Sequence, residues 1–144
     1  MLKRWYQVSK GENLILKEIE VIQGIIKRMA YNSLAIKTWT VILVVVALLT
    51  REAKVQTFAV FVPLIVLWFL DAYYLWQERM YRKLYNWVIR NRWNTDEYLF
   101  DMNAYRFRAE IQSPLRIMFS LTLGWFYGSI AVLVLVYCVS LILW

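Results

Sequence analysis

The sequence has 144 residues, of which 61% are hydrophobic and 17% aromatic, and its formal net charge is +7. The length suits one compact unit, and the long uncharged runs predict an integral membrane protein rather than a soluble domain. The sequence has no His, which removes the commonest general base and transition-metal ligand, and its single Cys excludes an internal disulfide bond.

The sequence also lacks the motifs of catalysis and of cofactor binding. It contains no Gly-rich phosphate loop, no metal-ligand spacing and no nucleophile placed beside a plausible base. We therefore expect neither an enzyme nor a cofactor. Cys138 lies in an apolar run, where we expect a buried, unreactive thiol.

Residues 1–33 are predicted to hold a cytoplasmic amphipathic helix. Ser9 and Glu12 fit a capping box, which predicts that the helix begins at Ser9. Apolar residues recur at alternating spacings of four and three, at Ile15, Ile19, Ile22, Ile26 and Met29. Such a seam packs on its own chain or lies on the membrane, or it associates with another copy, and two heptads are too short to specify a coiled coil alone.

Residues 34–76 are predicted to form a transmembrane hairpin. The first span covers about residues 34–50, and Lys37 at its start has a side chain long enough to reach the headgroups. Residues 51–54 make a tight polar turn, and the second span begins near Gln56.

One helix, covering residues 57–85, is predicted to cross the membrane and to continue into water. Asp71 carries its only formal charge before Glu78. A helix of 29 residues reaches about 43 Å, which exceeds the roughly 30 Å of a bilayer core. Pro63 lies within this helix, and membrane helices tolerate proline because neighbouring groups satisfy the freed carbonyl.

The segment 77–116 is polar, aromatic and basic, with 8 Lys and Arg against 5 Asp and Glu. Asn91, Asn94 and Asn103 predict breaks between short helices in this cytoplasmic segment. The pair Ser113-Pro114 predicts the start of a new helix.

Residues 117–144 carry no charge, and they predict a third span that is tilted or that begins with an interfacial turn. Lys and Arg number seven before Thr38, two in the hairpin turn and eight in residues 77–116. Because cytoplasmic loops carry an excess of Lys and Arg, these counts place the N-terminus and the basic segment in the cytoplasm and the C-terminus outside.

Two ionisable residues are predicted at similar depth in the hairpin. If its turn centres near Lys54, Lys37 lies 17 residues before it and Asp71 lies 17 residues after it. A carboxylate at this depth is costly unless it is paired or wetted. A structural Lys37–Asp71 pair and an Asp71 that lines or gates a water-filled path are both compatible with the sequence.

Asp71 shares one helix face with Glu78, Arg82 and Tyr85, because the spacings are seven, four and three residues. Arg28 is predicted near the level of Glu78, either in contact with it or as a solvated charge. Asp71, Lys37 and Glu78 are therefore the candidate residues for a channel and its gating.

The third predicted span carries small residues every four positions, at Ser120, Gly124 and Gly128. Such stripes let helices approach closely, either within one chain or between chains. A sparse polar face of Thr122, Ser129 and Ser140 suits a narrow pore lining or ordinary hydrogen bonds between helices.

The cytoplasmic face combines positive charge with aromatic rings. Positive charge next to stacking surfaces is typical of proteins that bind single-stranded nucleic acid, whereas topology and anionic lipid produce the same composition. The candidate ligand-binding residues are Lys27, Arg28, Arg79, Arg82, Lys83, Tyr81, Tyr85 and Trp87.

Two stretches carry a resemblance. RMAYNS at residues 28–33 and KTW at 37–39 lead into the first span, and FLDAYYL at 69–75, ER at 78–79 and YRKLY at 81–85 leave the second. Together they resemble a widespread family of small bacterial inner-membrane proteins. The layout also resembles, more loosely, the membrane effectors of Hailong-type antiphage systems, in which a nucleotidyltransferase partner makes short DNA oligomers that hold a tetrameric channel closed.

The sequence thus predicts an all-α membrane protein with three spans. Three spans are too few to enclose a path alone, so we expect a homo-oligomer, and the resemblance favours a tetramer. The resemblance implies a channel-forming antiphage effector in the bacterial inner membrane, gated from the cytoplasmic face by an oligonucleotide. The alternative is a non-conducting membrane anchor or scaffold for a cytosolic partner.

Overall fold

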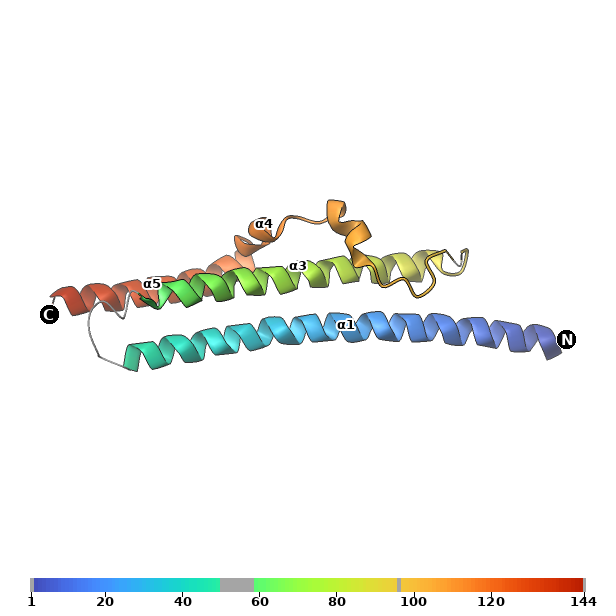
Figure 1. The fold of residues 1–144 in the computed structure, drawn as a ribbon, viewed down its shortest axis with the longest axis horizontal. Coiled ribbons are helices and arrows are strands. Elements are labelled where there is room, and N and C mark those ends of the chain that lie inside the picture. Colours follow the sequence, from blue (N-terminus) through green and yellow to red (C-terminus); the bar gives the residue numbers. More distant parts are fainter. Residues whose placement is uncertain (1, 50–58, 96, 144) are drawn as a thin grey trace. The chain divides into compact units, whose positions relative to one another are not determined.

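The computed structural model describes residues 2–49, 59–95 and 97–143, and within these ranges the chain is helical with no strand. The elements are helix α1 (Leu2–Leu49), α3 (Phe61–Asn91), the 3-10 helix η1 (Ala104–Glu110), α4 (Pro114–Met118) and α5 (Leu121–Leu143) (Figure 1). The predicted all-α class is confirmed for this part of the chain. Contacts divide it into two compact units, Met1–Met29 with Gln77–Ile111 and Ala30–Trp76 with Gln112–Trp144.

The first unit packs the early part of α1 against the later part of α3. Met80, Leu84 and Val88 recur every four residues and are buried, so they form one buried face of α3, and Ile22 of α1 is completely buried in the same unit. Ile22 belongs to the predicted apolar seam of α1. The other seam residues are only partly buried, and Ile15 and Ile19 line an open apolar pocket, so the structure does not decide between the sequence-based alternatives.

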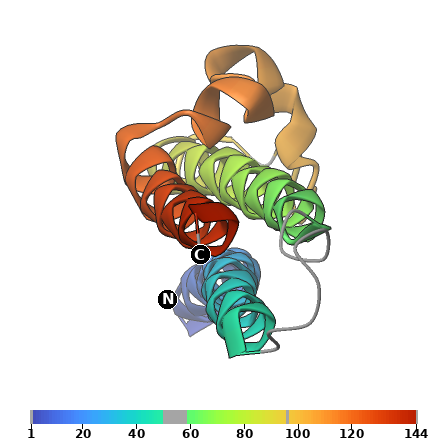
Figure 2. The ribbon, with the colours of Figure 1, turned by 90° about the vertical axis from the view of Figure 1, so that its left-hand side faces the viewer.

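The second unit brings together residues 30–49 of α1, residues 61–76 of α3 and α5 (Figure 2). Val44, Val60, Val134 and Cys138 are buried in one apolar cluster. The prediction of a buried Cys138 thiol is confirmed. Tyr137 of α5 also donates a hydrogen bond to the Leu48 carbonyl of α1, at 3.1 Å, close to this cluster.

Two of the described helical stretches are long and apolar enough to cross a membrane, Gly11–Leu49 and Leu121–Ser140. Only 22% of each apolar window is buried, although the core helix of a soluble protein is mostly buried. These helices are therefore compatible with a membrane protein. The second predicted span is not one of these two helices, so the count of three spans, the orientation and the cytoplasmic helices stay predictions. The predicted turn at 51–54 and the second-span start at Gln56 lie outside the described residues.

Three predicted boundaries differ from the structure. Helix α1 already includes Leu2, so Ser9 is an interior residue and not an N-cap, because residues 2–8 contain no Pro or Gly that would stop the helix. The same helix continues past Leu34 without a break. Pro63 lies in the first turn of α3, where its missing N–H costs little, rather than deep inside a helix.

The predicted polar breaks are found where the side chains supply local hydrogen bonds. Helix α3 continues past Gln77 and ends at Asn91. Asn103 accepts a hydrogen bond from the Tyr105 N–H and caps η1. Ser113 caps α4 with Pro114 in its first turn, and the chain then bends before α5. An interfacial position of this turn stays a prediction.

Candidate functional site

A buried carboxylate lies at the meeting point of the three helices of the second unit. Asp71 of α3 is 0% exposed. The ammonium of Lys37 lies 2.6 Å from Asp71 Oδ2, so the predicted Lys37–Asp71 pair is present. Lys37 is one helical turn after Ser33, and both residues thus face α3 from the same side of α1.

Two hydroxyl groups complete the surroundings of the Asp71 carboxylate. Ser33 donates a hydrogen bond to Oδ1, and Tyr127 of α5 donates one to Oδ2 at 3.0 Å. Lys37 Nζ also donates to Ser33 Oγ at 2.8 Å. Ser33, Lys37, Asp71 and Tyr127, which we call the Asp71 cluster, therefore satisfy a charge that would otherwise be costly to bury.

Aromatic packing holds Tyr127 in place. The Trp68 ring stacks on Tyr127 with centroids 5.6 Å apart and planes 12° apart. Trp68 Nε1 also donates to the Met118 carbonyl at 2.9 Å, next to the bend between α4 and α5. The orientation of the Tyr127 hydroxyl is thus fixed by both packing and hydrogen bonding.

The pairing of Asp71 favours the structural one of its two predicted roles. A residue that lines a water-filled path has to present its charge to that path, whereas the Asp71 carboxylate is completely buried and paired. Its role in gating stays a prediction. Glu78, the third channel candidate, lies in the first unit and pairs with Arg82 at 2.7 Å. The described residues show no ion pair between Glu78 and Arg28, and Arg28 is exposed, so the alternative of a solvated Arg28 fits this structure.

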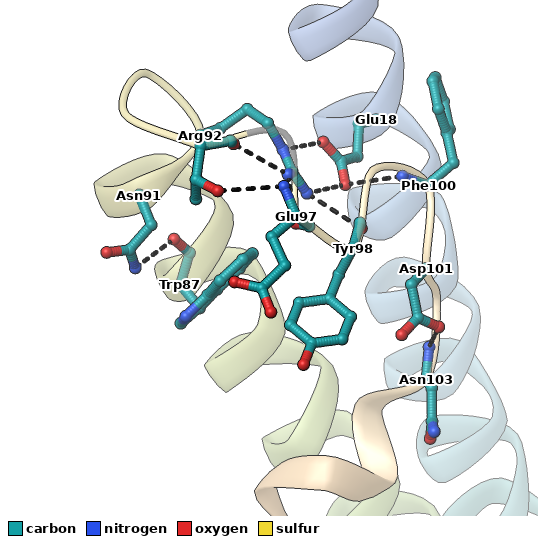
Figure 3. A network of polar contacts seen from close by, with 10 residues as sticks. Glu18, Trp87, Asn91, Arg92, Glu97, Tyr98, Phe100, Asp101 and Asn103 are labelled. Atoms are coloured by element: carbon teal, nitrogen blue, oxygen red, sulfur yellow. Dashed lines mark hydrogen bonds and ion pairs between the residues drawn. The ribbon is translucent and has the colours of Figure 1, made fainter.

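A second buried ion pair, between Glu18 and Arg92, was not predicted. Both side chains are only 1% exposed, and the guanidinium donates to the two carboxylate oxygens at 2.6 and 2.7 Å (Figure 3). Glu18 precedes buried Ile22 by one helical turn. A charged residue on the apolar face of a helix was the signal in the sequence that could have revealed it.

Arg92 also organises the chain that follows α3. Its guanidinium donates to the carbonyls of Thr95, Glu97 and Tyr98, and Glu18 accepts from the Phe100 N–H (Figure 3). Tyr98 and Phe100 both have positive φ, at 60° and 57°, a backbone conformation that costs free energy for residues other than Gly. The buried pair supplies the hydrogen bonds that hold this loop in that conformation.

Three aromatic rings, from α3, from this loop and from η1, contact the side chain of Arg106. The Arg106 guanidinium lies over the rings of Trp87, Tyr98 and Phe107, at 4.4, 4.8 and 5.0 Å from their centroids. Trp87 was predicted to stack on a ligand base. In the structure this ring contacts Arg106, Arg92 and Tyr98 and so packs within the first unit, while its stacking on a ligand stays a prediction.

The predicted ligand residues all belong to the first unit, but the structure gathers only two of them at one pocket. Arg82 and Tyr85 line a pocket of about 330 Å³ with Gln23, Ile26 and Asn86, and Gln23 donates to the Tyr85 hydroxyl at 3.1 Å. The remaining candidates, Lys27, Arg28, Arg79, Lys83 and Tyr81, do not line this pocket, and Lys83 pairs with Glu110.

Within the described residues, the glycines of the small-residue stripe on α5 do not pack against another helix of the same chain. A Cβ atom on Gly128 would meet nothing within 4 Å, and one on Gly124 would meet only the Phe119 carbonyl oxygen at 4.0 Å. The stripe instead lines an open apolar groove of about 610 Å³, together with Ser120 and Trp125. Of the two predicted uses of the stripe, contact between chains is the one that this geometry leaves open.

Comparisons of the chain with protein-family models, curated proteins and solved structures find no match. The resemblances noted from the sequence are therefore untested and stay predictions.

The buried Glu18–Arg92 pair leads to a stability prediction. We expect Glu18→Gln to lower the free energy of unfolding by about 3–5 kcal/mol, because it leaves a buried guanidinium without a counter-charge. Lys83→Met is the matched control, since it breaks an exposed pair whose loss costs about 1 kcal/mol or less. Unfolding of the detergent-solubilised protein, followed by tryptophan fluorescence, measures both. Equal losses would contradict a special role for the buried pair.

Proposed function

We propose that the chain is the membrane subunit of a homo-oligomeric channel, an antiphage-type effector of the bacterial inner membrane. Three apolar segments would span the membrane, with the N-terminus in the cytoplasm and the C-terminus outside. Support for membrane insertion comes from the two largely exposed apolar helices, and support for the orientation comes from the uneven distribution of Lys and Arg.

The open groove on α5 is the observation that carries the assembly. Gly124 and Gly128 leave space that no other part of the described chain fills. Ser120 Oγ, at one end of the groove, is buried without a hydrogen-bond partner in the described structure. A second copy would supply the missing packing against the glycines, and a small-residue stripe suits such a helix pair.

A hydroxyl row next to the groove supports conduction. Thr122, Ser129 and Ser140 are exposed in the described chain, and their spacing places them on one side of α5. Ser129 and Ser140 donate to the Phe126 and Tyr137 carbonyls of their own helix, so their oxygen lone pairs still face outward. Copies joined through the neighbouring groove would turn this row toward a shared path between protomers.

We propose that a ligand gates the channel by binding to the pocket of the first unit that Arg82 and Tyr85 line. The pocket offers the Arg82 guanidinium, the Tyr85 ring and the Asn86 amide at one opening. These groups suit a phosphate, a base and a base edge, respectively, so the pocket is compatible with a short single-stranded oligonucleotide.

The non-conducting anchor is the second candidate, and the Asp71 cluster favours it. A cation pore would need the Asp71 carboxylate to face the ion path. In the protomer this carboxylate is instead paired with Lys37 and hydrogen-bonded to two hydroxyls. An anchor needs a firmly closed helix bundle and no polar path.

Filling the groove tests the assembly. We expect Gly128→Leu to convert the oligomer to monomers in mild detergent and to abolish the depolarisation caused by induced expression, because a bulky side chain blocks close approach of α5. Gly24→Leu is the matched control, since its Cβ also meets nothing within 4 Å but it lies on α1 and does not line the groove. A monomeric parent protein, or a Gly128→Leu oligomer of unchanged size, would refute this interface.

The accessibility of engineered cysteines to a thiol reagent tests whether ions pass along the hydroxyl row of α5. In a Cys138→Ser background, we expect a charged thiol reagent to block the current of Ser129→Cys but not that of Leu135→Cys. Leu135 is also exposed, at 55%, but lies about a third of a turn away from the hydroxyl row. If the parent protein conducts no current in planar bilayers, the anchor replaces the channel; if both variants respond alike, the path does not follow this row.

A titration with short single strands at two salt concentrations tests the ligand. We expect Arg82→Gln to lower affinity and to flatten the salt dependence, because fewer counterions are released. Tyr85→Leu should cost roughly 1–3 kcal/mol per stacked base without changing the salt slope. Arg116→Gln, an exposed charge in the second unit, is the control for net charge. If nothing binds at low salt, the basic face serves topology and lipid instead.

A further inference from the structure

The Asp71 cluster has the chemistry of a site for a monovalent cation. A single positive centre, Lys37 Nζ, lies 2.6 Å from Asp71 Oδ2 and 2.8 Å from Ser33 Oγ. Tyr127 adds a third oxygen, 3.0 Å from the same Oδ2. Carboxylate and hydroxyl oxygens are the ligands that hard cations prefer, and two of them, from Asp71 and Ser33, contact the single positive charge here.

The net charge of the cluster favours a cation with a single positive charge. Asp71 contributes one negative charge and is 0% exposed, so a second positive charge would be buried without compensation. The described residues contain no group of three His, Cys, Asp or Glu that could hold a divalent or transition metal. An alkali cation therefore fits the cluster, and a divalent ion does not.

The resident ammonium differs from the carboxylate in its access to the surface. The Lys37 side chain is 24% exposed, whereas that of Asp71 is completely buried. A lysine side chain has a long flexible stem and a strongly hydrated head group, so it can leave a half-buried position without unfolding of its helix. The carboxylate that stays behind then needs another cation.

We propose that Ser33, Asp71 and Tyr127 form a binding site for an alkali cation, and that Lys37 fills this site with its own tethered ammonium. When Lys37 moves out to the surface, Na⁺ or K⁺ takes its place against Asp71. The exchange keeps the cluster neutral, and so the contacts between the three helices are kept in either state. The inference depends only on the second unit and holds whether the assembly conducts ions or not.

Removal of the ammonium tests the proposal directly. Lys37→Met keeps an unbranched side chain of good helix propensity but deletes the charge. We expect the purified full-length variant to unfold at a higher temperature in NaCl or KCl than in choline chloride of equal ionic strength, and the gain to grow with cation concentration. The parent protein, in which the tethered ammonium competes with the free ion, should show a much smaller difference between the three salts than Lys37→Met. Tryptophan fluorescence reports unfolding, since the chain has eight Trp.

Two control variants separate cation binding from general salt effects. Lys37→Met combined with Asp71→Asn has no carboxylate to hold the ion, so the difference between sodium and choline should vanish. Lys83→Met deletes an ammonium from an exposed pair with Glu110, and it should show no preference for alkali ions over choline.

The same experiment can overturn the proposal. If Lys37→Met unfolds at the same temperature in sodium, potassium and choline salts, the cluster binds no alkali cation and Lys37–Asp71 is only a structural pair. Lys37→Gln is the second neutral variant in case Lys37→Met does not fold. If both neutral variants fail to fold in every salt while Lys37→Arg folds, a fixed charge is required and the proposal is wrong.

Discussion

The second unit depends on a single buried carboxylate. Asp71 has to be paired, because an ionised group among apolar side chains is otherwise too costly to bury. Its partners come from two other helices, Ser33 and Lys37 from α1 and Tyr127 from α5. A shift of either helix by one residue turns its side chains by 100° and breaks these contacts. The carboxylate therefore fixes the register of helices whose apolar surfaces alone would pack in several ways.

The first unit also contains a buried carboxylate, Glu18, and its partner is an arginine rather than a lysine. Arg92 forms a bidentate ion pair with Glu18, and its guanidinium also donates hydrogen bonds to the carbonyls of the following loop. A lysine cannot replace it, because an ammonium has no planar fork and fewer donors. Lys37, by contrast, makes a compact contact from a side chain that is still 24% exposed. The Glu18–Arg92 pair is therefore held by many hydrogen bonds, whereas the Lys37 ammonium is partly exposed and can, as we propose, move away from Asp71.

The sequence predicted those features that depend on residues close in the chain or on simple symmetry. The end of α3 at Asn91 and the start of α4 at Ser113-Pro114 follow from local hydrogen bonding. The Lys37–Asp71 pair followed from equal distances to the predicted hairpin turn. The part of Tyr127 in the cluster could not be predicted, because it lies 56 residues away from Asp71 on a helix without charges. The N-cap at Ser9 was wrong because a capping pattern also occurs inside helices.

Helix α5 shows how the buried carboxylate also decides what the protomer presents outside. Because residues 121–143 carry no charge, hydrophobicity alone does not orient this helix. The bond from Tyr127 to Asp71 does so, and it turns Leu123, Val134 and Cys138 inward. Gly128 follows Tyr127 directly, so it lies 100° around the helix, at the open groove. The same contact that closes the inside of the bundle thereby sets which face of α5 is free to meet another chain.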